Sequence, residues 1–167
     1  LLKKFVADPR LRIHRNPHNL GRVKNYRQGL YELAKGDWVL VLDGDDFLQD
    51  HAYVSKAMAI AASDPDIDLV FSNALRLIED RGGILEPAIE NKDLPPVMTG
   101  PDLFLRLAGK KSISLFHNTA IYRREKAVNL DFYRRDIISS DWESLHRYIL
   151  TGKVAFVNTN ASVWRIH

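Results

Sequence analysis

The sequence has no cysteine among its 167 residues, which excludes disulfide bonds and metal sites built from thiolates. Long apolar runs are also missing, because none approaches the roughly 18 residues that a membrane-spanning helix requires. The opening residues, LLKKF, carry no signal-peptide cleavage pattern. From these absences we expect a cytoplasmic location, including the cytoplasmic face of the membrane.

An excess of charge of one sign is missing as well. The chain has 24 Lys and Arg against 21 Asp and Glu, a formal net charge of +3. Its pI is about 9.2, but the basic residues do not cluster on one predicted helix, so no nucleic-acid partner is expected. The hydrophobic share of 46% and the charged share of 27% are those of an ordinary globular domain with a core.

Apolar periodicity divides the chain into alternating helices and strands, followed by shorter mixed elements. Helices are predicted between Asn19 and Gly36 and over residues 50–63, 99–109 and 139–153. In the first of them, one apolar face is formed by Val23, Tyr26, Leu30 and Leu33. Strands are predicted over 11–15, 38–42, 67–72, two pieces of 74–85, 119–124, 154–158 and 162–167. This order predicts one α/β domain over residues 1–167, with a mostly parallel sheet whose strand at 38–42 is buried on both faces.

Local signals mark the ends of three helices. Asn19 is a candidate N-cap, and Gly36 stands where a helix end favours a left-handed residue. Thr99 precedes an early proline and is a second candidate cap. Ser140 and Glu143 have the spacing of a capping box, which predicts a helix start there.

Three carboxylates come directly after the strand predicted at 38–42, in the stretch DGDD at residues 43–46. Ligands of open α/β sheets bind at the carboxyl ends of the strands, and Gly44 lets the backbone turn tightly there. Oxygen ligands of this kind suit Mg²⁺ or Mn²⁺, which one or two carboxylates often hold together with substrate phosphates. Spacing alone leaves two interpretations open, a metal–diphosphate site and a solvated acidic turn before a helix.

The stretch NPHNLGRVKNYRQGLYELAKGDWVLVLDGDDFL resembles the family 2 glycosyltransferases of the GT-A fold. The family has Asn-x-Gly, Asn-x-x-x-Gly-Leu, Ala-x-Gly-(Asp/Glu) and, after an apolar strand, Asp-x-Asp-Asp. These patterns are present at residues 19–21, 25–30, 34–37 and 43–46. The stretch SSDWESLHRYILTGKVAFV resembles the family's Glu-Asp segment, and VWRIH resembles its closing aromatic-Arg-x-His.

The resemblance implies a GT-A-like fold, with a Rossmann-like, mostly parallel sheet and flanking helices. The family begins with a strand–helix–strand unit that holds much of the nucleotide-base pocket, and LLKKFVADPRLRIHRN resembles the segment after that unit. We therefore expect the domain to be partial at its N-terminus. A homodimer or a partner chain is expected to cover the sheet edge that this leaves exposed.

For activity, the resemblance implies transfer of a sugar from a nucleotide-diphosphate donor, with a UDP-sugar favoured, to a hydroxyl of a glycan or lipid-linked acceptor. Transfer is expected to invert the anomeric centre and to use Mn²⁺ or Mg²⁺, in polysaccharide biosynthesis at the cell envelope. Asp45 is the leading metal ligand by resemblance. Asp43 is expected to contact the donor ribose or the metal, and His167 to complete the metal or diphosphate site.

Other residues take roles from the same resemblance. Asp141 matches the Asp of the Glu-Asp pair and is the candidate catalytic base, although Ser140 stands where the family often has Glu. Lys24 and Asn25 are expected near the donor nucleotide, with a solvated helix face as the alternative. Asp46 is expected either to support the metal ligands or to face the acceptor.

Two residues beside these motifs are predicted to belong to the core. Trp142 directly follows the candidate base and could pack under a sugar ring, but a core position is favoured. His117 precedes a predicted strand and could line the acceptor cleft, but a hydrogen-bonded core histidine is favoured.

Two other functions compete with a glycosyltransferase. A sugar nucleotidyltransferase shares the sheet and an Asp-based metal site, but usually has a glycine-rich, basic loop near its start, and none is visible here. The stretches SDWE and WRIH favour the transferase. An inactive or binding-only fragment of such a domain is the second alternative, and binding of a nucleotide donor distinguishes it from an enzyme.

Overall fold

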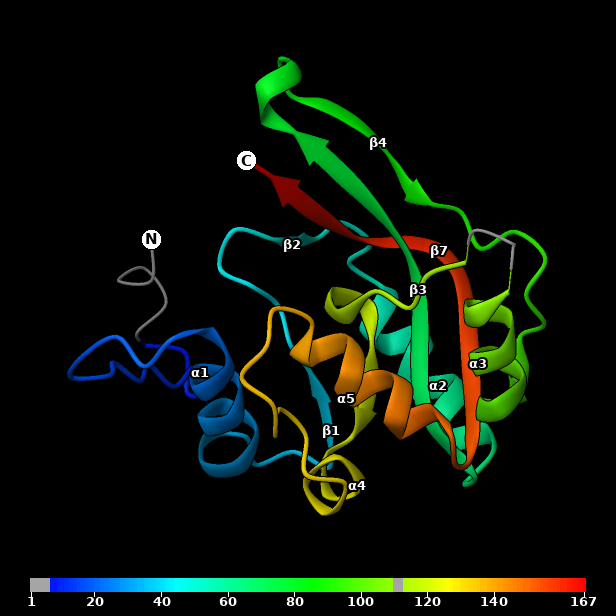
Figure 1. Cartoon of the computed structure of the whole chain (residues 1–167), viewed down its shortest axis with the longest axis horizontal. Helices are drawn as coiled ribbons and strands as arrows, with labels where there is room; N and C mark the ends of the chain where they lie inside the picture. The colour runs from blue at the N-terminus through cyan, green and yellow to red at the C-terminus, as the bar shows by residue number, and fades with distance from the viewer. Residues whose placement is uncertain (1–6, 110–112) are drawn as a thin grey trace.

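Two long parallel strands form the centre of the molecule. The computed structural model describes residues 7–109 and 113–167. In it, β3 (Ile67–Ile78) pairs along its whole length with β7 (Lys153–Ile166). Figure 1 shows both strands crossing the molecule and extending, with the hairpin strand β4 (Ile84–Ile89), beyond the helices.

Shorter strands border this central pair in the order β1-β6-β3-β7-β2. On the β3 side, β6 pairs with the first part of β3 and β4 with its last part. On the β7 side, β5 pairs with the first part of β7 and β2 with its last part. The bounds of these strands are β1 (Trp38–Leu40), β2 (Phe47–Leu48), β5 (Val97–Thr99) and β6 (Ile121–Arg123).

The α/β class with flanking helices is confirmed, but the prediction of a mostly parallel sheet is wrong. Within residues 7–109 and 113–167, β3 and β7 form the one parallel ladder, and the other five ladders are antiparallel. The reason is partly the connections, because residues 79–83 are too few for the crossover that a parallel neighbour needs. The strand predicted to be buried on both faces, β1, is half-buried and lies at one end of the strand order.

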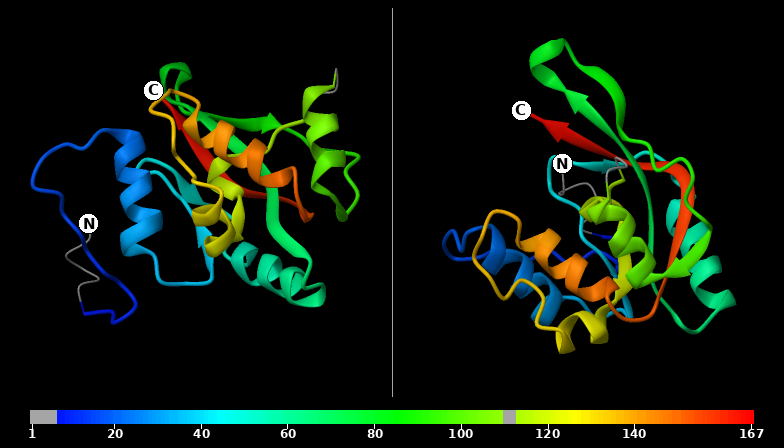
Figure 2. Two further views of the ribbon diagram at one scale, coloured as in Figure 1. Left: turned by 60° about the horizontal axis from the view of Figure 1, so that its bottom comes forward. Right: turned by 45° about the vertical axis from the view of Figure 1, so that its right-hand side comes forward.

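Helices cover both faces of the sheet. On one face, α2 (Tyr53–Ser63) packs Tyr53, Ala57 and Ala61 against Ile67 and Val70 of β3. The other face carries α1 (Arg22–Gln28), α3 (Gly100–Ala108), α4 (Arg124–Asn129) and α5 (Ser140–Ile149). The right-hand view of Figure 2 shows α5 and α2 on opposite sides of the central strands.

The larger core lies under α5. Its buried residues Leu145, Tyr148 and Ile149 recur at the spacing of one helix face and pack with Phe71 of β3. Each such side chain contributes about 1.5–3 kcal/mol when fully buried. Because this face is fixed against the sheet, the first turn of α5 is fixed at the end of the sheet where the acidic turn lies.

The first predicted elements differ from the structure. Residues 11–15 form no strand, and most of their side chains are exposed. The helix begins at Arg22, and Asn19 instead accepts a hydrogen bond from the Gly21 N–H at 2.8 Å. Beyond Gln28 the chain makes a π-helical turn (Gly29–Leu33) and then leaves in an extended conformation, so Gly36 does not end the helix.

The signals for the other two helix starts have different outcomes. Thr99 caps α3 as predicted, because its hydroxyl accepts a hydrogen bond from the Asp102 N–H at 3.2 Å. The prediction of a capping box at the start of α5 is wrong. Ser140 points into the core, Ser139 is the N-cap without a side-chain bond, and Glu143 pairs with Arg147 at 3.0 Å.

The two strands predicted at 154–158 and 162–167 are one strand, β7. Its register against β3 shifts near Asn73, so an irregularity breaks the apolar pattern without ending the strand. None of the helices in the described part of the chain combines the length and apolar character that crossing a membrane requires.

The close packing of α3 on α5 gives a test of the fold. A β-carbon added at the buried Gly100 would overlap the backbone carbonyl of Ile149. We expect Gly100→Ala to lower the free energy of unfolding by about 3 kcal/mol, the upper end for overpacking. Urea denaturation followed by circular dichroism measures this change.

Gly29→Ala is the matched control, because its added β-carbon meets nothing within 4 Å and its φ of −54° suits alanine. It should raise the free energy of unfolding by about 0.5–1 kcal/mol. Equal urea midpoints for the two variants would contradict the packing of α3 against α5.

Candidate active site

The acidic turn lies between β1 and β2, beside the end of β7. The Asp46 N–H donates to the Asp43 carbonyl at 3.1 Å, which closes the turn. β2 then pairs antiparallel with β7, with Phe47 opposite Val163. This pairing brings the turn next to the closing residues of the chain, Trp164 to His167.

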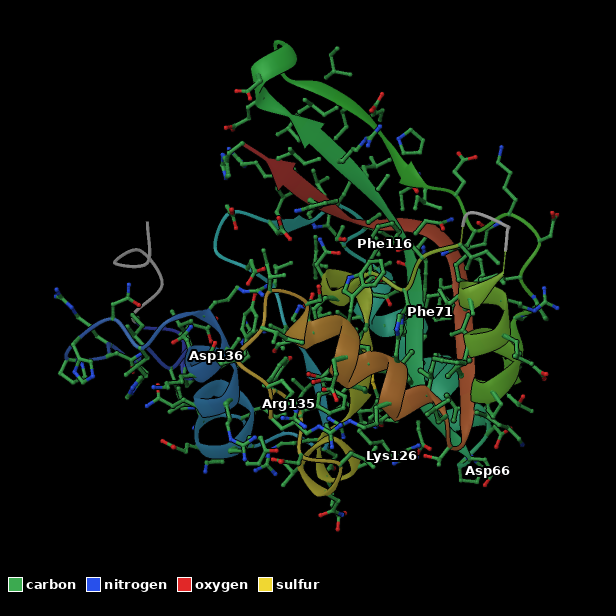
Figure 3. All side chains as sticks on the ribbon, in the orientation of Figure 1. Asp66, Phe71, Phe116, Lys126, Arg135 and Asp136 are labelled. Atoms are coloured by element: carbon green, nitrogen blue, oxygen red, sulfur yellow. The ribbon has the colours of Figure 1, made fainter. Side chains whose placement is uncertain are left out.

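A pocket of about 220 Å³ joins the acidic turn to the start of α5. Asp43 and Asp46 line it together with Asp141 from the first turn of the helix. The other lining residues are Arg22, Phe116, His117, Asn118, Trp142 and Trp164. Figure 3 shows Phe116 beside the middle of the central strands, far from Lys126 and Asp66 near their lower end. The structure thus brings the candidate base and the acidic turn together.

Helix α1 orients the first carboxylate of the turn. Tyr26 is buried in α1, and its hydroxyl donates to Oδ1 of Asp43 at 2.6 Å. Burial and the neighbouring Asp43 raise the pKa of Tyr26 well above its ordinary value, so the phenol stays protonated as the donor. Asp43 therefore faces the pocket from a fixed position.

Asp46 braces the turn with both of its carboxylate oxygens. Oδ2 accepts a hydrogen bond from Asn118 Nδ2 at 2.9 Å, and Oδ1 accepts one from the Arg165 N–H at 3.0 Å. Burial raises the pKa of this carboxyl, and the two hydrogen bonds partly offset that effect. From the sequence, Asp46 is expected either to support the metal ligands or to face the acceptor. These two contacts favour a supporting role, in which Asp46 holds the acidic turn in place.

Asp45 points to the outside of the turn, where it meets His167. His167 Nε2 lies 3.0 Å from Oδ2 of Asp45, and Nδ1 lies 3.0 Å from Oε2 of Glu79. The hydrogen bond from His167 lowers the pKa of Asp45, and the bonds to Asp45 and then Glu79 raise the pKa of His167. Two of the three predicted metal ligands are therefore neighbours.

His117 lies under the pocket and contacts two tyrosines. Its Nε2 is 2.9 Å from the hydroxyl of Tyr133, and its ring packs edge-on against Tyr26 at 5.4 Å between centroids. Burial lowers its pKa, so the imidazole is neutral at pH 7. The favoured interpretation as a hydrogen-bonded histidine agrees with this contact, although the residue also lines the pocket.

The prediction that Trp142 belongs to the core is wrong. Its side chain is 51% exposed and lines the pocket. The buried face of α5 contains Ser144, Leu145 and Tyr148, and Trp142 lies outside that face. A helix of this length buries one side only, so a tryptophan two residues from the helix start remains at the surface.

A second pocket, of about 550 Å³, lies beside the start of α1. It is lined by residues 15–22 and Asn25, whose Oδ1 accepts a hydrogen bond from Asn16 at 3.0 Å. Lys24 is exposed on α1 and is not among the lining residues of this pocket. Arg22 lines both this pocket and the acidic one, and its guanidinium donates to the backbone carbonyl of Ile137 at 3.4 Å.

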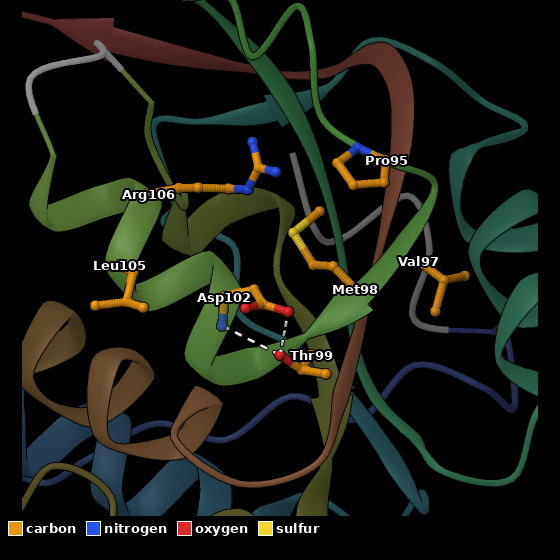
Figure 4. A pocket seen from close by; sticks show the side chains of 7 residues that line it. All are labelled: Pro95, Val97, Met98, Thr99, Asp102, Leu105 and Arg106. Atoms are coloured by element: carbon orange, nitrogen blue, oxygen red, sulfur yellow. Dashed lines mark hydrogen bonds between the residues drawn. The ribbon is translucent and has the colours of Figure 1, made fainter.

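A third pocket, of about 560 Å³, lies between β5 and α3. Figure 4 shows its one carboxylate, Asp102, in contact with Thr99, whose hydroxyl lies 2.6 Å away. None of the residues predicted for the site lines it. Its size alone therefore does not make it the better candidate.

The sequence model of the family described as Glycosyl transferase family 2 matches residues 1–129. The chain belongs to glycosyl transferase family 2. The matched part of this family 2 chain contains the acidic turn and the residues from Asn19 to Asp37 that carried the resemblance. Asp141 and His167 lie beyond it, so the roles expected for them rest on the local resemblance, and for Asp141 also on the pocket that it lines.

Similar proteins include the uncharacterized protein Mb1547 of Mycobacterium bovis and the uncharacterized protein Rv1520 of Mycobacterium tuberculosis. Each is 24% identical to this family 2 chain over 150 residues, which is 89% of the chain. The chain spans 40% of the length of these relatives.

The described side chains of this chain form no complete metal site of their own. Within the described residues, no group of three or more acidic or histidine side chains is arranged to hold a metal ion alone. His167 lies between Asp45 and Glu79, so the three do not converge on one point. Asp45 and His167 still offer two ligands, and Mg²⁺ or Mn²⁺ commonly takes few protein ligands together with phosphate oxygens.

Sequence reasoning missed several residues of this site. Tyr26 has only the spacing of an apolar helix face, Trp164 is only the aromatic residue of the closing motif, and Asn118 carries no motif of its own. Glu79 could have been found only from the register of the central strands, because Ile78 pairs with Ile166 and the next residues are therefore neighbours.

The contacts of His167 in this family 2 chain predict its titration. We expect a pKa above the usual value of about 6.5, and Asp45→Asn should lower it because the main hydrogen-bond partner of the imidazole loses its charge. The contact stabilises the fold below the unfolded pKa of the imidazole and loses that effect as pH rises through the raised pKa. An NMR titration of the imidazole protons measures it.

His146 serves as the internal reference, because burial lowers its pKa and Asp45 is not among the causes. It should titrate below 6.5 in both proteins. If His167 also titrates below 6.5 in the wild type, its contact with Asp45 and Glu79 is wrong.

Proposed function

We propose that this chain is the catalytic part of an inverting glycosyltransferase. It would move a sugar from a nucleotide-diphosphate donor, with a UDP-sugar favoured, to an acceptor hydroxyl. The observation that supports this most directly is the pocket that unites Asp43 of the acidic turn with Asp141 of α5. Membership of glycosyl transferase family 2 supports the general activity.

Donor binding would use the two pockets that meet at Arg22. The pocket beside α1 offers amide groups, including Asn25, to the nucleoside, and Asp43 faces the donor from the acidic pocket. Arg22 lies where the two pockets meet, so its guanidinium would lie beside the donor phosphate next to the nucleoside. Lys24, on the same helix, would contribute positive charge rather than a direct contact.

The diphosphate would lie toward Asp45 and His167. Mn²⁺ or Mg²⁺ held there supplies charge that stabilises the leaving diphosphate. Asp45 and His167 are the residues that would hold it, and Glu79 would keep the imidazole oriented from its other nitrogen. Asp46 would hold the turn through its bonds to Asn118 and Arg165 and would not change partners during the reaction.

Asp141 would act as the base. The acceptor oxygen attacks the anomeric carbon from the face opposite the diphosphate, the bond to the diphosphate breaks, and the hydroxyl proton passes to Asp141. Direct displacement of this kind inverts the anomeric centre. Asp141 is half-buried at the start of α5, so a neighbouring hydroxyl can reach it.

The wider setting belongs to the same proposal. We place the reaction in the cytoplasm or at the cytoplasmic face of the membrane, in polysaccharide synthesis for the cell envelope. The outer edge of β1 would be covered by a second copy or by another chain, since the described sheet ends there.

Calorimetric titration tests donor binding. UDP, GDP and TDP are titrated with and without Mn²⁺ into the wild type and Asp45→Asn. We expect binding of one nucleotide that depends on Mn²⁺ and weakens at least about tenfold in Asp45→Asn, since even outer-shell changes at metal sites cost about 10–100-fold.

Glu125→Gln is the matched control. Glu125 is exposed on α4, which begins directly after β6 at the end of β1 opposite the acidic turn. Nucleotide affinity should not change in this variant. Failure of all three nucleotides to bind the wild type would contradict the proposed function.

Asp141→Asn separates chemistry from binding. Once a nucleotide is found, the release of that nucleotide from its sugar donor in the presence of an acceptor is measured. We expect kcat to fall about 10²–10⁴-fold, the usual contribution of a general base, while nucleotide affinity stays within twofold, roughly the error of the assay. A variant that keeps its kcat rules out Asp141 as the base.

A further inference from the structure

The tryptophans of this chain are distributed unequally between the core and the pocket. The chain has three, at positions 38, 142 and 164. Trp38 lies in β1, where the guanidinium of Arg123 stacks over its ring at 4.7 Å. Trp142 and Trp164 line the acidic pocket, with exposed fractions of 51% and 46%.

Neither pocket tryptophan is needed to fill the core. Trp142 contacts His146 one turn further along α5, at 5.6 Å between ring centroids. Trp164 is on β7, opposite Arg76 of β3. Two large apolar rings from different elements therefore remain half-exposed at the same small pocket, and exposed aromatic surface of this kind marks binding sites.

The charge of the pocket limits what the two rings can bind. Asp43, Asp46 and Asp141 line it, against one cationic side chain, Arg22. An anionic group in this pocket would face a net excess of negative charge. Carboxylates accept hydrogen bonds from hydroxyl groups, so a neutral, hydroxyl-rich molecule is favoured.

The two properties together describe the surface of a neutral sugar. A pyranose ring has an apolar C–H face that can lie on an indole and a rim of hydroxyl donors that carboxylates can accept. The pocket volume of about 220 Å³ is below the usual range of roughly 300–1,000 Å³ for drug-sized ligands, so it has room for a single ring rather than a larger group.

We propose that Trp142 and Trp164 form the acceptor subsite for the terminal ring of a neutral glycan. One face of that ring lies on indole, and one of its hydroxyls is directed to Asp141. This proposal rests on the proposed function, because it names the acceptor of that reaction. The acceptor oxygen forms the bond to the anomeric carbon of the donor, the bond to the diphosphate breaks, and Asp141 takes the hydroxyl proton.

Tryptophan fluorescence tests the subsite directly. In Trp38→Phe, all the tryptophan emission comes from Trp142 and Trp164. Cellobiose, maltose, mannobiose and N,N′-diacetylchitobiose are titrated into this variant. We expect at least one of them to change the emission with saturation.

Further variants locate the binding. In the Trp38→Phe background, Trp142→Ala and Trp164→Ala should each weaken saccharide binding about tenfold, measured by calorimetry, as expected for aromatic residues at the centre of an interface. Trp142→Tyr should restore part of the loss, since an aromatic ring remains. The double variant Trp142→Phe with Trp164→Phe, which keeps Trp38, should show no change in emission with any saccharide.

The outcomes separate this proposal from the proposed function. UDP, GDP and TDP binding is measured on the same Trp38→Phe protein. Nucleotide binding without any saccharide response overturns the glycan subsite and leaves the transferase standing, whereas loss of both contradicts the transferase as well. A fluorescence response to geranyl phosphate and not to the saccharides overturns the subsite in favour of a lipid-phosphate acceptor.

Discussion

The parallel pairing of β3 with β7 is the constraint on which the site depends. It joins a strand near the middle of the sequence to the last strand, and its register sets where the end of β7 lies. Because the register continues to Ile78 and Ile166, Glu79 and His167 become neighbours. In the same strand, the backbone N–H of Arg165 donates a hydrogen bond to Asp46. The strand then leads to His167, whose side chain contacts Asp45.

The three carboxylates of the turn, close in sequence, are separated by their partners. Asp43 is held from α1 by a buried tyrosine, Asp46 from two sides by an amide and a backbone N–H, and Asp45 by an exposed histidine. Each carboxylate has a different donor, which reduces the repulsion that the stretch DGDD would otherwise carry. The turn is therefore held in place by contacts from α1, η4 and the last residues of the chain.

The sequence predicts the parts of this structure that depend on neighbouring residues. The helix at Thr99, the turn of carboxylates after β1 and the hairpin around Gly82 and Gly83 are explained by local spacing and turn chemistry. Local spacing does not explain the direction of the strands, because β6 pairs with both β1 and β3, which are distant from it in the sequence. The same limit applies to the cap of α5, where burial of Ser140 outweighs its capping tendency.

The candidate site divides in the same way. The resemblance predicts Asp43, Asp45, Asp141 and His167 as site residues, since each belongs to a short motif. Tyr26 was assigned to an apolar face by its spacing, and only the structure shows that its hydroxyl reaches Asp43. A core position is expected for Trp142 because large apolar residues usually are buried, and only the structure shows that it lies outside the buried face of α5.

The double anchoring of Asp46 affects how variants of the acidic turn are interpreted. Its two oxygens tie residues 43–46 to η4 (His117–Thr119) on one side and to β7 on the other. A substitution of Asp46 removes the acceptor of the Arg165 N–H and of the Asn118 amide. The attachment of the whole turn is then weaker. Loss of activity in an Asp46 variant would thus measure the mechanical integrity of the loop, and would say little about which carboxylate takes part in the chemistry.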